Sequence, residues 1–112
     1  MAGERDVTPE QAEALHRDQD AQLIDVREDY EWDAGRIGGA RHIVLGEVAS
    51  QASTIERDRP VVFYCRVGSR SAMAADAFRK AGYEAYSLGG GLEAWSGEGR
   101  PLEPDDGTVA NH

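Results

Sequence analysis

The pattern of apolar and polar residues along this chain predicts short strands that are separated by helical or irregular segments. The clearest strand, Pro60–Cys65, is β-branched and aromatic after its first residue and is too short for a helix. A run of this kind is typical of a strand that is buried on both faces of a parallel sheet. Further strands are predicted at Leu23–Val26, Arg41–Val44 and Tyr83–Leu88.

Helices are predicted between these strands. The first begins at Pro9, with Thr8 as its N-cap, and fades in the polar run Arg17–Asp20. The most regular helix extends from Ser69 to Ala81, has one apolar side, and is stopped by Gly82. Shorter or weaker helical segments are predicted at Glu28–Ala34, Gly46–Ile55 and Leu92–Ser96.

The alternation of strands and helices defines the fold class. It implies right-handed crossovers and a parallel sheet that is covered on both faces. We therefore predict an α/β fold, with a single domain over residues 1–101 and a mainly parallel central sheet of about five short strands. A chain of 112 residues, 40% of them hydrophobic, suits one core. Residues 102–112 contain Pro104, Asp105 and Asp106, and we expect them to form an acidic, disordered tail.

Composition narrows the class of partner. The formal net charge of −9 disfavours nucleic acid, because contacts with phosphates need clustered cations. No apolar run is long enough to suggest a membrane span or a signal peptide. One cysteine excludes an internal disulfide framework and suits a reducing compartment. We therefore expect a soluble, cytoplasmic protein that binds neither nucleic acid nor a membrane.

The acidic balance is reversed locally around the cysteine. Between residues 57 and 81, two carboxylates stand against six cations, which are Arg57, Arg59, Arg66, Arg70, Arg79 and Lys80. A cationic patch on an acidic body would attract small anions to this part of the surface. Ordinary solvated surface charge explains the four outlying cations equally well.

Cys65 lies where the central strand ends and a short polar loop leads into a helix. A helix N-terminus carries unpaired N–H groups and the positive end of the helix dipole, which stabilise a thiolate or a bound anion. Arg66 and Arg70 reinforce this field, and cysteines in such surroundings are often ionised near neutral pH. The sequence therefore predicts Cys65 as a nucleophile, and the alternative is a small buried hydrophobic residue.

The loop and two further segments resemble one known family. Cys65–Ser71 resembles the active-site loop of the rhodanese family of sulfurtransferases, Leu23–Ile43 its amino-terminal signature and Gly89–Trp95 its carboxy-terminal signature. The resemblance extends from about Val7 to Pro101, in the same order and spacing. It implies a rhodanese-like domain in which Cys65 is catalytic. The loop residues that it implies for substrate binding are Arg66, Val67, Gly68, Ser69, Arg70 and Ser71.

The length of the loop favours sulfur transfer over the other reactions of cysteine enzymes with this fold. In cysteine phosphatases that share the rhodanese fold, the active-site loop has the pattern Cys-x5-Arg and surrounds a tetrahedral phosphate. In this sequence, which resembles the rhodanese family, Cys65 and Arg70 are separated by one residue fewer and define the pattern Cys-x4-Arg. By resemblance, the shorter loop suits a single sulfur atom. Sulfur transfer is therefore our first interpretation, phosphatase or arsenate reductase chemistry the second, and a non-catalytic binding module the third.

The resemblance also implies a reaction and its partners. The Cys65 thiolate would take the outer sulfur of a small anionic donor, thiosulfate or a persulfide, and pass it to a thiol, cyanide or protein acceptor. Backbone N–H groups of the loop would hold the charge of the cysteine persulfide. This chemistry needs no metal and no organic cofactor.

Four polar residues could have either a structural or a functional role. Asp25 lies in an apolar strand and needs a partner, such as Arg27 or a backbone N–H. We interpret both residues as mainly structural, with Arg27 a further candidate for substrate binding because it follows a strand's C-terminal end. His42 has no recognisable group to orient it as a base. Arg70 is expected to bind donor charge, and the alternative is a tie to a carboxylate such as Asp25.

Overall fold

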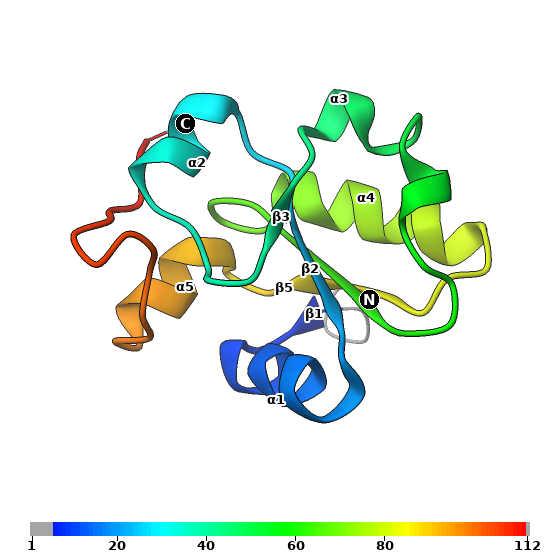
Figure 1. Ribbon diagram of the computed structural model, residues 1–112, viewed down its shortest axis with the longest axis horizontal. Coiled ribbons are helices and arrows are strands. Elements are labelled where there is room, and N and C mark those ends of the chain that lie inside the picture. Colours follow the sequence, from blue (N-terminus) through cyan, green and yellow to red (C-terminus); the bar gives the residue numbers. More distant parts are fainter. Residues whose placement is uncertain (1–5, 112) are drawn as a thin grey trace.

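The computed structural model describes residues 6–111 and shows five parallel strands in one sheet (Figure 1). Their spatial order is β1-β5-β4-β2-β3. The strands are β1 (Asp6–Val7), β2 (Gln22–Asp25), β3 (Arg41–His42), β4 (Val61–Tyr64) and β5 (Ala85–Leu88). The predicted α/β class, with a mainly parallel sheet of about five short strands, is confirmed.

Helices cover both faces of this sheet. Five α-helices and a short 3-10 helix are described, namely α1 (Pro9–Gln19), α2 (Asp29–Ala34), α3 (Leu45–Val48), η2 (Ala52–Thr54), α4 (Ser69–Lys80) and α5 (Gly91–Gly97). The first begins as the sequence predicts, because the Thr8 hydroxyl accepts the Gln11 N–H at 3.1 Å and the Gln11 side chain accepts the Thr8 N–H at 2.9 Å. The weak helix predicted over Gly46–Ile55 is divided into α3 and η2.

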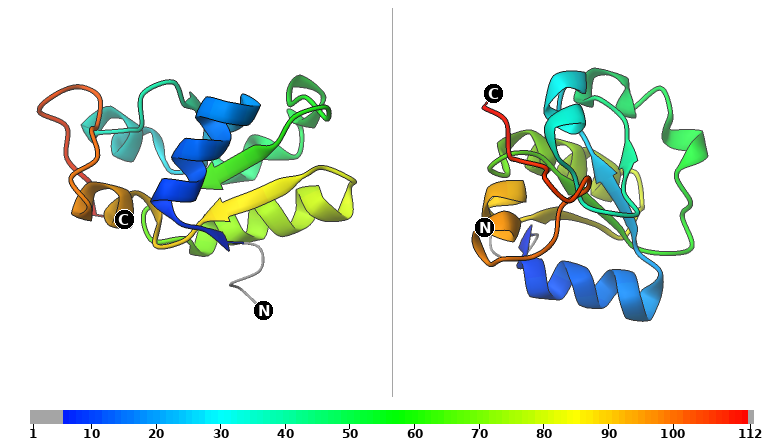
Figure 2. Two further views of the ribbon diagram at one scale, coloured as in Figure 1. Left: turned by 90° about the horizontal axis from the view of Figure 1, so that it is seen from below. Right: turned by 60° about the vertical axis from the view of Figure 1, so that its left-hand side comes forward.

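Strand β4 contacts the helices on both faces of the sheet. Phe63 faces a core that includes Ala74 and Phe78 of α4, together with Val48 of α3. Val62 and Tyr64 face a second core, formed with Ala12 of α1 and with Leu92 and Trp95 of α5. Figures 1 and 2 show α1 on one side of the sheet and α4 on the other. Both faces of β4 are therefore covered, so that all four of its residues are buried.

Strand β1 has no counterpart in the sequence prediction. It consists of two residues at the sheet edge, where Asp6 pairs with Ser87 and Val7 with Leu88 of β5. Two residues are too few to establish an alternating pattern. The pairing with β5 therefore defines this strand.

Residues 102–111 differ from the disordered tail that the sequence suggested. Backbone bonds of 3.0 and 2.7 Å join Arg36 and Glu103 in both directions, and the Thr108 N–H donates to the Ala34 carbonyl at 2.8 Å. Leu102 and Val109 are partly buried against the α1 and α5 side of the core. These two apolar residues and the backbone bonds hold an acidic segment beside the domain (Figure 2).

Within residues 6–111, every helix is too short or too polar to span a membrane.

Candidate active site

The Cys65 sulfur is buried at the carboxyl end of β4, against the first turn of α4. Its side chain has no exposed surface. Sγ accepts the backbone N–H of Gly68 at 3.1 Å and that of Ser71 at 3.4 Å, and it lies 3.5 Å from the Ser71 hydroxyl. Because these donors come from the loop and the helix N-terminus, they stabilise negative charge on the sulfur.

Helix α5 fixes the other side of the loop. The Leu92 N–H donates to the Cys65 carbonyl at 2.8 Å, and the Glu93 N–H donates to the Arg66 carbonyl at 3.0 Å. Gly91 makes this approach possible, because a Cβ there would lie 2.6 Å from the Cys65 carbonyl oxygen. Gly68 has a φ of +112°, which turns its N–H toward the sulfur at a conformation that other residues rarely adopt.

Arg70 is paired with Glu31 of α2, rather than with Asp25. Its guanidinium donates to the two carboxylate oxygens at 2.8 and 3.0 Å. Glu31 is fully buried, and it also accepts the Glu28 N–H at 3.1 Å. Burial by itself would raise the pKa of Glu31, but the bonds from Arg70 and from the Glu28 backbone outweigh it and lower that pKa. Glu31 therefore holds Arg70 as a buried ion pair.

Arg66, the other arginine of the loop, is held much less firmly. Its guanidinium forms an ion pair with Glu93 of α5 at 2.9 Å, and the two side chains are 30% and 52% exposed. Its Nε is buried and, among the described residues, has no hydrogen-bond partner. Arg66 is therefore the loop cation that an anion can reach at low cost, because solvent-exposed pairs contribute only about 0–1 kcal/mol.

The candidate Arg27 lies in the protein interior after β2. It is fully buried, with Nε donating to the two oxygens of Asp25 at 2.9 and 3.0 Å and Nη2 donating to Asp25 at 2.7 Å. Nη2 also donates to the Gly35 carbonyl at 2.7 Å, and the Arg27 backbone N–H donates to Asp25 at 2.9 Å. These bonds satisfy the strand aspartate and connect β2 to the end of α2. The contacts of Arg27 are thus those of a structural ion pair.

His42 is engaged away from the sulfur. Its Nε2 lies 2.7 Å from the Arg27 carbonyl oxygen, and its ring stacks on Trp32 with 4.9 Å between the ring centroids. These contacts hold the end of β3 against α2 and against Arg27, which precedes that helix. They give His42 a structural role.

Two residues at this site were not assigned a role from the sequence. Glu31 stands three residues after Glu28, in a capping-box spacing that gives its backbone position but leaves its bond to Arg70 undetermined. Ser87 of β5 is buried, and its hydroxyl lies 2.8 Å from that of Ser71. The feature that could have pointed to Ser87 is its position near the carboxyl end of a strand beside β4, because ligands of parallel sheets bind at these ends.

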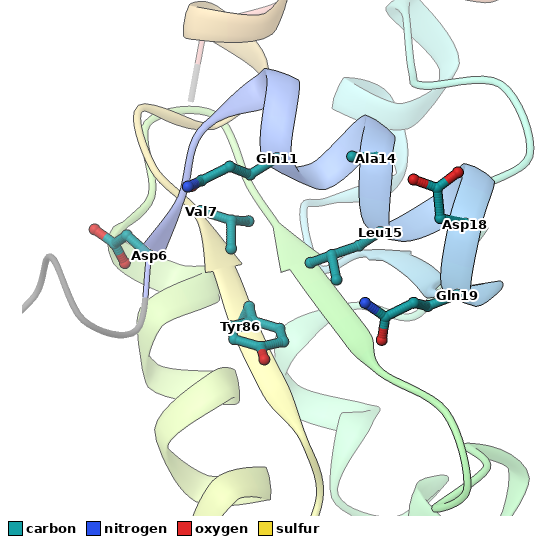
Figure 3. A pocket seen from close by; sticks show the side chains of 8 residues that line it. All are labelled: Asp6, Val7, Gln11, Ala14, Leu15, Asp18, Gln19 and Tyr86. Carbon is teal, nitrogen blue, oxygen red and sulfur yellow. The ribbon is translucent and has the colours of Figure 1, made fainter.

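A separate hollow of about 490 Å³ lies between α1 and the β1–β5 edge of the sheet. Figure 3 shows Leu15 of α1 and Tyr86 of β5 pointing into it, with Asp6 and Asp18 at its rim. The residues that line it do not include any from the 65–71 loop. It faces the α1 side of the sheet, whereas Cys65 belongs to the core on the α4 side. The hollow is therefore separate from the 65–71 loop.

Comparisons with known proteins agree with the geometry. The family model for the Rhodanese-like domain matches residues 8–98. Thiosulfate sulfurtransferase GlpE of Pseudomonas aeruginosa (strain LESB58) is 39% identical over 90 residues, which are 80% of this chain and 81% of that protein. A Bacillus subtilis (strain 168) protein named as a sulfurtransferase, YtwF, is 37% identical over 89 residues, which are 80% of this chain and 86% of that protein.

A solved structure is similar over nearly the same span. The crystal structure of a rhodanese-related protein from Thermoplasma volcanium has a TM-score of 0.79 and 27% sequence identity, covering 88% of this chain and 96% of that one. The stretch matched by the family model contains the 65–71 loop and helices α1 to α5.

Proposed function

The chain belongs to the rhodanese-like domain family, and from this we propose that it is a sulfurtransferase that uses Cys65. It takes a sulfane sulfur from thiosulfate or a persulfide donor and delivers it to a thiol, cyanide or protein acceptor. The observation that carries the proposal is the pair of N–H bonds from Gly68 and Ser71 to the sulfur. They support a cysteine that holds negative charge, first as a thiolate and then as a persulfide.

The reaction has two displacements at sulfur. The Cys65 thiolate attacks the outer sulfur of thiosulfate and a new S–S bond forms. The bond between the two thiosulfate sulfurs breaks, and its electron pair leaves with sulfite. An acceptor thiolate then attacks the terminal sulfur of the cysteine persulfide, which restores the Cys65 thiolate and releases a persulfide of the acceptor. The protein supplies nucleophile, position and N–H donors, so we propose no metal or organic cofactor.

We assign the binding of donor charge to Arg66 rather than to Arg70. Drawing Arg70 toward a donor would leave the buried Glu31 without its cation, and breaking a buried pair in this way costs about 3–5 kcal/mol. Arg66 has only an exposed partner, Glu93, and its unpartnered Nε is a further donor. Val67 and Ser69 are exposed, and we propose that they contribute to substrate binding through their backbone N–H groups.

Intact-mass spectrometry tests this function directly. Incubation with thiosulfate is expected to add the mass of one sulfur atom, and cyanide is expected to remove it. Cys65→Ser is the control, because it is nearly isosteric, leaves the loop N–H groups in place and lacks the nucleophile. Absence of the adduct, together with hydrolysis of an aryl phosphate or reduction of arsenate, would favour phosphatase-type chemistry. Absence of all these activities would favour a binding module.

A further inference from the structure

A buried chain of hydroxyl groups leads from the reactive sulfur to strand β5. The Ser71 hydroxyl lies 3.5 Å from Cys65 Sγ, 3.2 Å from the Gly68 carbonyl oxygen and 2.8 Å from the Ser87 hydroxyl. Ser71 has no exposed surface, and Ser87 is only 1% exposed. The direction of each hydroxyl hydrogen is therefore set by these neighbours rather than by water.

Counting hydrogens selects one direction for the chain. Each hydroxyl has one hydrogen to donate. Among residues 6–111, Ser71 is the only hydrogen-bond partner of the Ser87 hydroxyl. If Ser71 donated to Ser87, the hydrogen of Ser87 would be buried without an acceptor, which is costly. Donation from Ser87 to Ser71 avoids this cost and leaves the hydrogen of Ser71 for acceptors inside the loop.

In the described part of the chain, two such acceptors are within reach, the Gly68 carbonyl and the Cys65 sulfur. A negatively charged sulfur is the stronger acceptor, because hydrogen bonds to ionised groups are about twice as strong as neutral ones. The position of Ser87 fits this role. In the sheet register Ser87 pairs with Phe63, and Phe63 precedes Cys65 by two residues.

We propose that Ser87 is a positioning residue for sulfur transfer, because it holds the Ser71 hydroxyl with its hydrogen directed at the Cys65 sulfur. Ser87 acts through Ser71, without touching the substrate. The inference rests on the proposed function and deepens it, since the hydroxyl is directed at the atom that carries negative charge in the proposed reaction.

The test is the pH dependence of the alkylation of Cys65 by iodoacetamide. The midpoint is expected to move upward by about 1–2 pH units in Ser71→Ala, which loses a hydrogen bond to a charged group. In Ser87→Ala it is expected to move upward by a smaller amount, because the Ser71 hydroxyl remains but is no longer held by Ser87. Tyr83→Phe is the control, because it removes a hydroxyl that is bonded to Ala52 and Ile55, far from the loop. Its midpoint is expected to stay at the wild-type value.

None of these variants changes a charged side chain. The ion-paired side chains of the loop and of the elements beside it, which all stay in place, are Asp25, Arg27, Glu31, Arg66, Arg70 and Glu93. A change in the midpoint therefore reports the hydroxyl chain. Circular dichroism confirms folding of each variant, and Ser87→Thr, which keeps the hydroxyl, is expected to restore most of the wild-type midpoint.

The double variant distinguishes positioning from packing. If Ser87 acts through Ser71, then Ser87→Ala adds no further change in the Ser71→Ala background. An unchanged midpoint in folded Ser87→Ala, or the same change in both backgrounds, would overturn the proposal. Alkylation needs no sulfur donor. A failed thiosulfate adduct would therefore count against the proposed function alone, and a failed midpoint change against Ser87 alone.

Discussion

Replacing Arg70 by lysine distinguishes a structural tie from a donor-binding residue. Arg70 makes two hydrogen bonds to a carboxylate that is fully buried. Lysine keeps the charge but cannot reproduce the planar fork, so that one of the two bonds is lost. A hydrogen bond to a charged group contributes about 1.5–3 kcal/mol, and we expect Arg70→Lys to lower the free energy of unfolding by that amount.

Urea denaturation measures this loss. For a small domain with a slope of about 1.5 kcal/mol per M, the midpoint is expected to fall by about 1–2 M. Arg66→Lys is the matched control, since it makes the same substitution in the same loop at a pair that is partly exposed. Its unfolding free energy is expected to change by less than about 0.5 kcal/mol.

The opposite pattern would refute this reasoning. If Arg70 bound the donor, the Arg70→Lys protein would keep its urea midpoint. Its kcat/KM for thiosulfate would fall by about 5- to 150-fold, which corresponds to about 1–3 kcal/mol. Donor binding would then belong to Arg70, and the Glu31 contact would have to open during turnover.

Three further predictions concern the same loop. Arg66→Gln removes the accessible cation, and it is expected to lower kcat/KM for thiosulfate by about 5- to 150-fold with little change in the urea midpoint. The lowered pKa of Glu31 means that its stabilising contribution is present above its unfolded pKa, about 4.3, and is lost as the pH falls through the lower folded pKa. The difference in unfolding free energy between wild type and Glu31→Gln is therefore expected to shrink in urea titrations carried out below about pH 4. Gly91→Ala places a methyl group against the Cys65 carbonyl at a φ of +61°, and it is expected to lower the unfolding free energy by about 1–3 kcal/mol. An unchanged melting temperature for Gly91→Ala would show that the backbone contact is loose.

The elements that carry Cys65 could be predicted from the sequence, because their patterns are strong and local. Pro60–Cys65 is continuously apolar after its first residue, and the helix from Ser69 has an apolar side and a glycine stop. These features placed the cysteine between a buried strand and a helix N-terminus. The structure has β4 and α4 at these positions.

The ion pairs around the loop could not be predicted in the same way. Asp25 pairs with Tyr64 in the sheet register, so a contact with Arg70 was a reasonable expectation. Arg27, two residues away, folds back and donates to both oxygens of Asp25 instead. Glu31 reaches Arg70 from a different helix. Such pairing depends on side-chain direction in three dimensions, which hydrophobic periodicity leaves open.

Strand β1 and residues 102–111 were missed for another reason. Each is a short segment whose order depends on contacts with distant residues, such as those of Val7 with Leu88 and of Glu103 with Arg36. The composition of a segment carries no information on its contacts with distant residues. An acidic segment with few apolar residues therefore has the composition of a disordered one.

The carbonyl groups and the N–H groups of the loop point in different directions. The carbonyls of Cys65 and Arg66 are turned outward to α5, while the N–H groups of Gly68 and Ser71 are turned inward to the sulfur. Two of the hydrogen bonds to the sulfur thus come from main-chain N–H groups, which substitution of an exposed loop side chain leaves in place. We therefore expect Val67 and Ser69, which are exposed, to tolerate substitution although they belong to the proposed substrate-binding loop. Their side chains can differ in size and polarity while the N–H donors to the sulfur stay in place.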